Sequence, residues 1–331
     1  MNNIWILAEQ HAGEIKPVSY ELLTRGLALA AKSGRKLCAM VFGNNISEAG
    51  LNELILRGAD RVVAVEAQEL ENFLVEPYSV CMLDLIKKYE PEIILAAATS
   101  MGRTLMPYVA MTADAGLTAD CTELDIEEET GLLLQTRPAI GGNIMATIKC
   151  PEHRPQMSTI RPKSTPEAQR QEGRKGEIIR LKAPEKAAQS RIEFEGFEAD
   201  TEEMNLQDAE KIVCVGRGIK TEANIKLARE FADLLGAALG ATREVVDRGW
   251  LSYPHQIGLS GKTVTPKLYI GIGVSGAIQH LAGMQTSECV IAINKDPEAQ
   301  IFQVADFGIV GDIFEILPIL IEKLKAGEKI C

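Results

Sequence analysis

KLYIGIGVSGAIQH, residues 267–280, leads from an apolar run directly into a glycine-rich turn. Gly271, Gly273 and Gly276 form the pattern G-x-G-x-x-G between a predicted strand and a predicted helix that begins near Ser275. Glycines at these positions allow a tight turn and a close approach of the backbone, and free N–H groups at a helix start can bind a pyrophosphate. The pattern predicts an α/β unit that binds a dinucleotide, with an ordinary tight turn as the alternative.

The residues on both sides of this stretch extend the α/β pattern over the second half of the chain. Strands are predicted at Lys211–Val215, Lys267–Ile272 and Cys289–Ile293, and helices at Glu222–Leu235, Ser275–Ala282 and Asp312–Lys325. Polar side chains at Arg217, Arg243, Ser275 and Asn294 each follow a strand. Because loops at the carboxyl ends of parallel strands converge on one crevice, we expect these side chains to surround a common ligand site.

Two details of this half bear on the kind of dinucleotide. Asn294 stands about twenty residues after the glycines, where NAD-binding units place an Asp or Glu for the ribose hydroxyls. Arg217, in a second glycine turn (VGRG, residues 215–218), is placed to bind a phosphate through two hydrogen bonds. No histidine–aspartate pair for hydride transfer stands near the turn. FAD therefore fits better than NAD, and an NAD-dependent oxidoreductase or a non-redox adenine-nucleotide-binding subunit are the alternatives.

The first half predicts another parallel sheet. Its apolar runs are separated by helix-length amphipathic segments, which is typical of strands buried on both faces. Gly34 is expected to end the first helix, and Ser47 to cap the second. Strands are predicted at Ile4–Leu7, Leu37–Phe42, Arg61–Val65 and Glu92–Ala98, and helices at Tyr20–Lys32 and Glu48–Arg57.

After Leu117 the pattern changes to alternating apolar and polar residues, which predicts a short antiparallel extension. Its segments are LTADCTELDIEEE, GLLLQTRP, GGNIMATIKC and PQMSTIRP. Residues 161–176 are rich in charge, Pro and Gly and predict a linker or surface excursion, and 177–206 a strand-like tie between the halves. The predicted fold class is α/β: an N-terminal Rossmann-like domain with the antiparallel extension (residues 1–206), and a C-terminal doubly wound parallel-sheet FAD-binding domain (residues 207–331).

Composition restricts the other classes of function. The 331 residues carry a net charge of -11, which leaves no excess of Lys and Arg for general nucleic-acid binding. No apolar run is long enough to span a membrane, and we expect no signal peptide and a cytoplasmic location. The seven cysteines form no C-x-x-C pair, and His11, His153 and His255 show no metal-ligand spacing, so no metal site is predicted.

At this point the sequence resembles the α subunits of electron transfer flavoproteins. Val213–Lys325 is similar to the FAD domain of that family, and the first half to its N-terminal domain through TSMGR, TADCTELDI and TRPAIGGNIMATI. The C-terminal resemblance is carried by VGRG, GATREVVDRGW, IGLSGKTVTPKLYIGIGVSGAIQHLAGM and INKDPEAQIFQVADFGIVGD. It implies a flavin-based electron carrier with no catalytic residue of its own.

The resemblance implies which residues contact FAD. Arg243 would lie beside the isoalloxazine, the loop 257–260 at its redox edge, and residues 275–280 at the pyrophosphate and ring. Asn294 and Asp312 would bind the adenosine half. The implied set is Arg217, Thr242, Arg243, Gln256, Ile257, Gly258, Leu259, Ser260, Gly261, Gly273, Ser275, Gly276, Ala277, Ile278, Gln279, His280, Asn294, Asp312 and Ile313.

Two of these residues have a physical reason to be there. A flavin that carries an extra electron bears negative charge around its N1–C2=O side, and Arg243 and His280 would stabilise that charge as cation or donor. The family usually has Thr at Ser260, so the hydroxyl is kept while the methyl that restricts its rotamer is lost.

The resemblance also implies partners. A 1:1 heterodimer with an electron transfer flavoprotein β subunit is expected, with a flavoprotein dehydrogenase, of the acyl-CoA type, as redox partner. The β subunit would hold AMP or a second FAD. TSMGR and TRPAIGGNIMA resemble members that bifurcate the electrons of NADH, with Arg137 and the 141–143 turn near the second flavin. The alternative is that Arg137 and these glycines only shape a β-turn.

Overall fold

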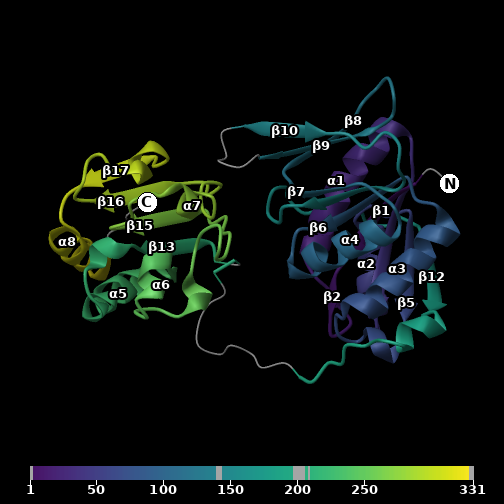
Figure 1. Cartoon of the computed structure of the whole chain (residues 1–331), viewed down its shortest axis with the longest axis horizontal. Coiled ribbons are helices and arrows are strands. Elements are labelled where there is room, and N and C mark those ends of the chain that lie inside the picture. Colours follow the sequence, from purple (N-terminus) through teal and green to yellow (C-terminus); the bar gives the residue numbers. More distant parts are fainter. Residues whose placement is uncertain (1–2, 139–143, 197–205, 208, 328–331) are drawn as a thin grey trace. The chain divides into compact units, whose positions relative to one another are not determined.

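The structure, a computed structural model, describes residues 3–138, 144–196, 206–207 and 209–327. It divides into two compact units, Met1–Phe197 and Glu198–Cys331, and each has its own parallel sheet (Figure 1). The division after residue 206 stays a prediction, because residues 197–205 lie outside the described part.

The N-terminal unit is built on a seven-stranded sheet in the order β12-β5-β4-β1-β6-β11-β7, and every pairing in it is parallel. The strands are β1 (Ile4–Ala8), β4 (Leu37–Gly43), β5 (Arg61–Glu66), β6 (Ile93–Ala97), β7 (Leu117–Cys121), β11 (Gln156–Ile160) and β12 (Glu177–Lys182). A short hairpin, β2 (Gln10–His11) and β3 (Glu14–Ile15), follows β1. The predicted N-terminal strands are confirmed, and β12 shows that the expected tie begins as an edge strand of this sheet.

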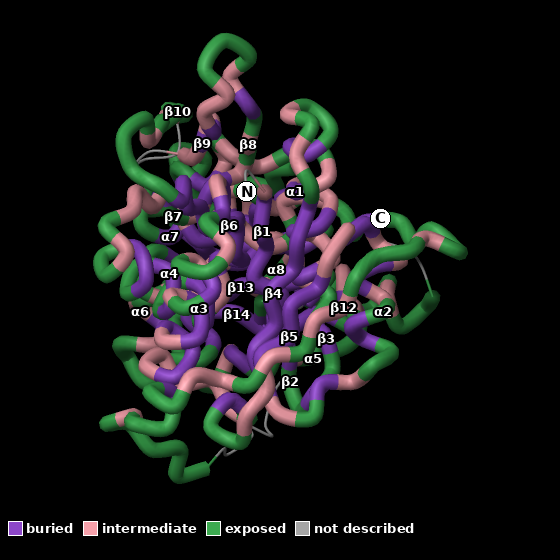
Figure 2. The backbone as a smooth tube through the Cα atoms, turned by 90° about the vertical axis from the view of Figure 1, so that its right-hand side faces the viewer, coloured by how far each residue is buried: buried purple, intermediate pink, exposed green. Residues whose placement is uncertain are grey.

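Alternate residues of the strands enter two cores on opposite faces of the sheet. Ile4 and Ile6 pack with α1 (Val18–Ser33) and α2 (Glu48–Leu56). Trp5 and Leu7 pack with α3 (Val75–Tyr89) and α4 (Ser100–Thr112) on the other face. Figure 2 shows β1, β4 and β5 buried between these layers. Burial on both faces is the reason that these strands are apolar throughout.

The predicted helix ends are confirmed in this unit. Gly34 ends α1 in the left-handed conformation, with φ of 65°, and its N–H donates to the carbonyl of Ala30. Ser47 caps α2 through its side chain, which accepts a hydrogen bond from the N–H of Gly50.

The predicted antiparallel extension is partly wrong. PQMSTIRP contains β11, which pairs in parallel with β6 and β7, and LTADC forms β7 of the same sheet. Every residue of β11 is buried, and its polar side chains are satisfied internally: Ser158 donates to Gln135 Oε1 at 2.6 Å, and Thr159 Oγ1 accepts from the N–H of Asp120 at 2.9 Å. Its alternating pattern therefore reflects buried hydrogen bonds, not a solvent-facing side.

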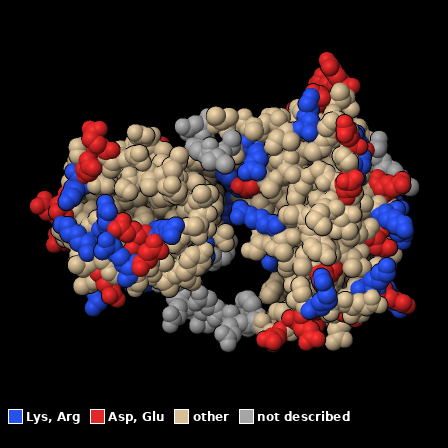
Figure 3. Space-filling model, in the orientation of Figure 1, with Lys and Arg blue, Asp and Glu red and all other residues tan. Residues whose placement is uncertain are grey.

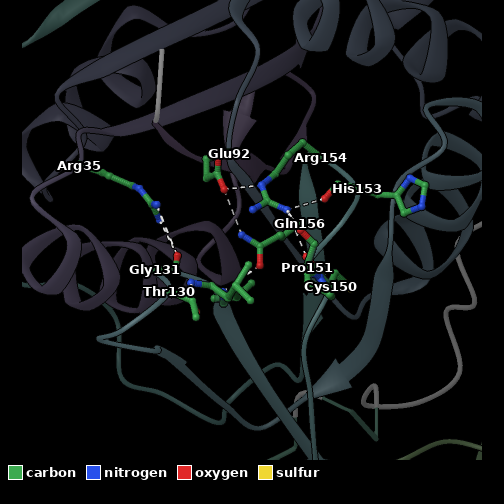
Figure 4. A network of polar contacts seen from close by, with 11 residues as sticks. Arg35, Glu92, Thr130, Gly131, Cys150, Pro151, His153, Arg154 and Gln156 are labelled. Carbon is green, nitrogen blue, oxygen red and sulfur yellow. Dashed lines mark hydrogen bonds and ion pairs between the residues drawn. The ribbon is translucent and has the colours of Figure 1, made fainter.

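The remaining segments do form an antiparallel sheet, in the order β10-β9-β8. Its strands are β8 (Glu123–Ile126), β9 (Leu133–Pro138) and β10 (Met145–Ile148). Figure 4 shows Glu92, which accepts from Arg154 and Gln156. The amide oxygen of Gln156 accepts in turn from the N–H of Leu133 at 2.8 Å. These contacts tie β9 to the parallel sheet.

The C-terminal unit has a five-stranded parallel sheet in the order β14-β13-β15-β16-β17. Its strands are β13 (Lys211–Val215), β14 (Ala238–Ala241), β15 (Leu268–Ile272), β16 (Val290–Asn294) and β17 (Phe307–Val310). One face packs on α5 (Ile225–Leu235), α6 (Arg243–Asp247) and α8 (Ile313–Lys325). The other face packs on α7 (Ile278–Leu281) and on irregular segments that contribute Ile257, Val264 and Met284. The doubly wound, parallel-sheet prediction is confirmed.

Two local predictions in this unit differ from the structure. The helix expected from Ser275 begins only at Ile278, because Gly276 has φ of +81° and interrupts helical geometry. The strands β14 and β17 were not among the predicted strands: each has only four residues and contains a glycine, and all four residues of β17 are exposed.

Within the described residues, no helix is long and apolar enough to cross a membrane. That part of the chain also contains no cluster of three or more His, Cys, Asp or Glu side chains suited to a metal ion.

Candidate functional site

A cavity of about 820 Å³ lies at the carboxyl ends of the C-terminal strands. The chain order of the strands is 2-1-3-4-5, so neighbouring connections leave β13 and β15 in opposite directions. Such a switch point is where open α/β sheets bind ligands, and the volume is typical of a cofactor site. All the predicted cofactor contacts line the cavity except Gly261, Gly276 and Ile278.

The floor of the cavity depends on glycines in contact with backbone. A Cβ on Gly216 would lie 2.2 Å from the carbonyl oxygen of Gly273, and one on Gly218 would lie 2.6 Å from the Cα of Gly273. These distances leave no room for any side chain. The two turns after β13 and β15 therefore pack directly on each other, and both backbones reach the cavity.

The turn after β15 offers a row of hydrogen-bond donors. The backbone N–H groups of Val274, Ser275, Gly276 and Ala277 donate to no acceptor among the residues that the structure describes. Val274, Ser275 and Ala277 line the cavity. Consecutive free N–H groups of this kind form a concave anion site, which is suited to a diphosphate.

Three of the four described Lys and Arg side chains that line the cavity are paired with acids, and Figure 3 shows the two charges interspersed on the visible face of this unit. The pairs are Arg217 with Glu244 at 3.4 Å, Arg243 with Asp247 at 3.2 Å and Lys220 with Asp312 at 3.7 Å. All six side chains are at least 40% exposed, so each pair stabilises the fold little and can exchange its acid for a ligand phosphate. The cavity is also lined by five charged residues that were not predicted: Lys220, Glu244, Asp247, Lys295 and Asp296.

The loop 257–260 is held against the residues before and within α7. The N–H of Leu259 donates to the carbonyl of Gln279 at 2.7 Å, and Gly258 approaches Gln279 so closely that a Cβ would lie 2.9 Å from its oxygen. Gln256 donates from its side chain to Ser260 Oγ at 3.1 Å. The Ser260 hydroxyl hydrogen stays available to a ligand at this edge of the cavity.

His280 is the most deeply buried titratable group of the cavity wall. Its Nδ1 lies 3.0 Å from the carbonyl oxygen of Ile257, and its Nε2 lies 2.7 Å from the hydroxyl of Tyr269. Burial lowers the pKa of His280 to about 4, and it raises the pKa of the neighbouring Cys214 thiol to about 12. The imidazole is therefore neutral at physiological pH.

Two of the residues predicted to contact the cofactor also form hydrogen bonds that stabilise the protein itself. Asn294 donates from Nδ2 to the carbonyl of Val274 at 2.8 Å and accepts from the N–H of Asp296 at 3.0 Å, so it fastens the glycine turn to β16. Asp312 caps α8 by accepting from the N–H of Phe314 at 2.9 Å. Sequence pattern alone does not show these bonds, although an Asp directly before a helix is a capping signal.

The three predicted residues outside the cavity lie near it. Gly276 contacts Ile301, where a Cβ would lie 2.1 Å from the backbone nitrogen. A Cβ on Gly261 would lie 2.4 Å from the carbonyl oxygen of Gln256. Ile278 is 56% exposed at the start of α7. The two glycines shape the walls of the cavity.

In the N-terminal unit, the residues linked to a second nucleotide are only partly described, because 139–143 lie outside the described residues. Thr99 caps α4, and its hydroxyl donates to the buried carboxylate of Glu9, whose pKa burial raises. The pKa of the Asp120 carboxyl is raised by burial but lowered overall by three arginines, first Arg161, then Arg103 and last Arg137 on β9.

Known proteins resemble the chain over nearly its whole length. Residues 4–186 match the family model for the electron transfer flavoprotein domain, and residues 205–285 match that for the electron transfer flavoprotein FAD-binding domain. An electron transfer flavoprotein subunit alpha of Thermoanaerobacterium thermosaccharolyticum is 47% identical over 324 residues, which is 98% of this chain and 98% of that protein.

Two further relatives have names that refer to larger redox enzymes. A lactate dehydrogenase (NAD(+),ferredoxin) subunit LctC of Acetobacterium woodii is 42% identical over 98% of this chain and 77% of that protein. An acryloyl-CoA reductase electron transfer subunit beta of Anaerotignum propionicum is 38% identical over 98% of this chain and 96% of that protein. The chain therefore belongs to the electron transfer flavoprotein family, among its α subunits.

Proposed function

We propose that this chain binds one FAD in the cavity of its C-terminal unit and, as the α subunit of an electron transfer flavoprotein, carries electrons between flavin sites. The observation that carries the proposal is the row of free N–H groups at Val274–Ala277, placed at the switch point of the sheet. A row of neutral donors, flanked by cations that can exchange their acid partners for phosphate, suits a diphosphate. The rest of the cavity is available to the flavin and adenosine halves.

The residues of the cavity divide among the parts of FAD. Arg217, Lys220 and the 274–277 turn would hold the diphosphate. Arg243 and the loop 257–260 would hold the isoalloxazine, and Asn294 with its neighbours the adenosine. Bound FAD supplies the one- and two-electron chemistry, and the chain supplies orientation, hydrogen-bond donors and positive charge.

Flavin content tests this proposal directly. The purified full chain, produced with its β subunit, should show flavin absorbance and release FAD on denaturation. Arg217→Ala should lower the FAD affinity, while Arg229→Ala on α5, outside the cavity, should not. A colourless protein that binds NAD would instead support the dehydrogenase alternative. Binding of AMP or ADP without flavin would support the adenine-nucleotide alternative.

We further propose a 1:1 heterodimer with a β subunit and a flavoprotein dehydrogenase, of the acyl-CoA type, as redox partner. The name of the relative from Anaerotignum propionicum, an electron transfer subunit of an acyl-CoA-level reductase, supports this class. Size measurement after co-expression decides the first part. A stable FAD-loaded homodimer that ignores β would contradict it.

Electron bifurcation is the finer form of the proposal. It is supported by the relative whose name joins NAD(+) and ferredoxin in one lactate dehydrogenase. Arg137 and the TSMGR segment would then face a second flavin held by the β subunit. The measurement is the nucleotide content per heterodimer: two FAD would support bifurcation, and one FAD with one AMP would contradict it.

A further inference from the structure

The cavity wall contains a buried tyrosine–histidine contact that the proposed function does not use. Tyr269, on β15, is completely buried, and its hydroxyl lies 2.7 Å from Nε2 of His280. His280 is itself only 6% exposed and contacts the carbonyl oxygen of Ile257 through Nδ1 at 3.0 Å. Both ring nitrogens thus have a protein partner before any cofactor binds.

These two partners determine where the imidazole hydrogen lies. A carbonyl oxygen only accepts hydrogen bonds, so the hydrogen between Nδ1 and Ile257 belongs to Nδ1. A neutral imidazole protonated at Nδ1 has its lone pair at Nε2, which accepts the hydrogen of the Tyr269 hydroxyl. The thiol of Cys214 also lies near Nε2, at 4.0 Å, and brings no charge while protonated.

We infer that Tyr269 is a positioning residue that holds His280 as a neutral imidazole protonated on Nδ1. The inference concerns the protein alone, and its meaning for the cofactor rests on the proposed function. The other tautomer would turn the Tyr269 hydroxyl from donor to acceptor and leave the Ile257 carbonyl without its donor from Nδ1. The Ile257 carbonyl and the Tyr269 hydroxyl therefore favour the same tautomer, the one that fastens the loop 257–260.

This arrangement decides what His280 offers to a bound flavin. Its one N–H is already donated to the carbonyl of Ile257, so His280 brings an uncharged ring and no positive charge. The positive charge of this part of the site must then come from Arg243, one of the exposed cations that line the cavity. Tyr269, which touches no cavity space itself, would tune the flavin through His280 and the loop.

The tautomer can be measured without any flavin. In the full chain labelled with ¹⁵N-histidine and stripped of cofactor, long-range ¹H–¹⁵N spectra distinguish a protonated from an unprotonated ring nitrogen. The chain has four histidines, and His280→Gln identifies the signals of interest. We expect an unprotonated Nε2 and a protonated Nδ1 at pH 7. A protonated Nε2 in the wild type would overturn the inference.

Tyr269→Phe removes only the hydroxyl donor at Nε2 and leaves the Ile257 carbonyl in place, so the preference for the Nδ1–H tautomer should weaken, seen as partly converging Nδ1 and Nε2 shifts. Tyr78→Phe is the matched control, because Tyr78 is equally buried and its hydroxyl donates to the carbonyl of Leu70 at 3.0 Å, in the other unit. In the FAD-loaded protein, Tyr269→Phe should also shift the midpoint potential, and Tyr78→Phe should not.

Unchanged His280 signals in a folded Tyr269→Phe protein would show that the hydroxyl does not select the tautomer. If that variant does not fold, the wild type still decides: a slowly exchanging Tyr269 hydroxyl proton with a nuclear Overhauser effect to His280 supports the inference, and its absence contradicts it. A protein with the expected tautomer and no affinity for FAD would contradict the proposed function alone.

Discussion

Arg243 Nε lies 3.2 Å from Asp247 Oδ2, one turn further along α6, so a cavity cation is held by an acid of its own helix. Both side chains are more than half exposed, and pairs of this kind contribute about 0–1 kcal/mol. Asp247→Asn should therefore release Arg243 and tighten FAD binding by up to about fivefold. Titration of the apoprotein with FAD measures this. Asp233→Asn, an equal change of charge on exposed α5, should leave the affinity unchanged.

Arg243→Ala should make bound FAD harder to reduce, because the lost cation favours the flavin form that carries the extra electron. The expected decrease in the first midpoint potential is about 60 mV, the one-electron equivalent of roughly 1.4 kcal/mol. A reductive titration measures it. Arg248→Ala is the control, because Arg248 pairs with Glu244 and lies over Trp250 without lining the cavity. Equal shifts in both variants would mean that only the net charge matters.

Gly276→Ala should lower both FAD content and stability. Gly276 has φ of +81°, and an added Cβ would lie 2.1 Å from the nitrogen of Ile301. We expect a loss of at least about 2 kcal/mol from strain and overlap together. Gly249→Ala separates the two effects, since Gly249 has φ of +74° and nothing within 4 Å of the added Cβ. If urea unfolding shows that both variants lose the same free energy of unfolding, the whole effect comes from the positive φ and not from the overlap with Ile301.

His280 should make the C-terminal unit less stable in mild acid. Its pKa falls from the ordinary 6.5 to about 4 on folding, because burial disfavours the charged form. Between these values the unfolded chain binds a proton that the folded chain does not, so stability present above pH 6.5 is lost as the pH falls towards 4. The full effect is about 3 kcal/mol. Urea midpoints at pH 7 and 4.5 should differ less in His280→Gln than in the wild type or in the exposed His153→Gln.

Glu21 should act in the opposite direction in the N-terminal unit. Burial raises its pKa from 4.5 to about 7, although the N–H of Lys163 donates to its carboxylate at 2.6 Å. A raised pKa favours the folded state at low pH, and this stability is lost as the pH rises from 4.5 through 7. Glu21→Gln should therefore raise the melting temperature at pH 8, with a gain of order 1 kcal/mol after solvent screening. Glu69→Gln, at an exposed position, should not.

The parallel sheets could be predicted because their strands are buried on both faces and read as apolar runs, as in Ile4–Ala8 and Lys211–Val215. β11 could not, because Gln156, Ser158 and Thr159 are polar and buried, and their partners come from distant segments such as Gln135. Local pattern contains no information on bonds of that kind.

Residues that line the cavity could be identified from sequence where backbone geometry dictates the residue, as at Gly273, and where a polar residue follows a strand, as at Arg217 and Asn294. Their contacts with a cofactor stay predictions. The acids Glu244 and Asp247 were missed, because acidic side chains are not expected around a site that binds an anion. Tyr269 was missed for another reason: inside an apolar strand it has the pattern of a core residue, and only its contact with His280 distinguishes it.

The contact between Gly218 and Gly273 has a consequence for how this sequence can change. Neither residue has space for a Cβ, and each blocks the other, since a Cβ on Gly273 would lie 2.7 Å from the Cα of Gly218. No single replacement at one position makes room at the other. In a library that randomises both codons, the variants that keep bound FAD should have glycine at both positions. The two positions are therefore constrained jointly. Directed evolution of the flavin potential would have to work through neighbours such as Ser260, which is exposed at the cavity edge.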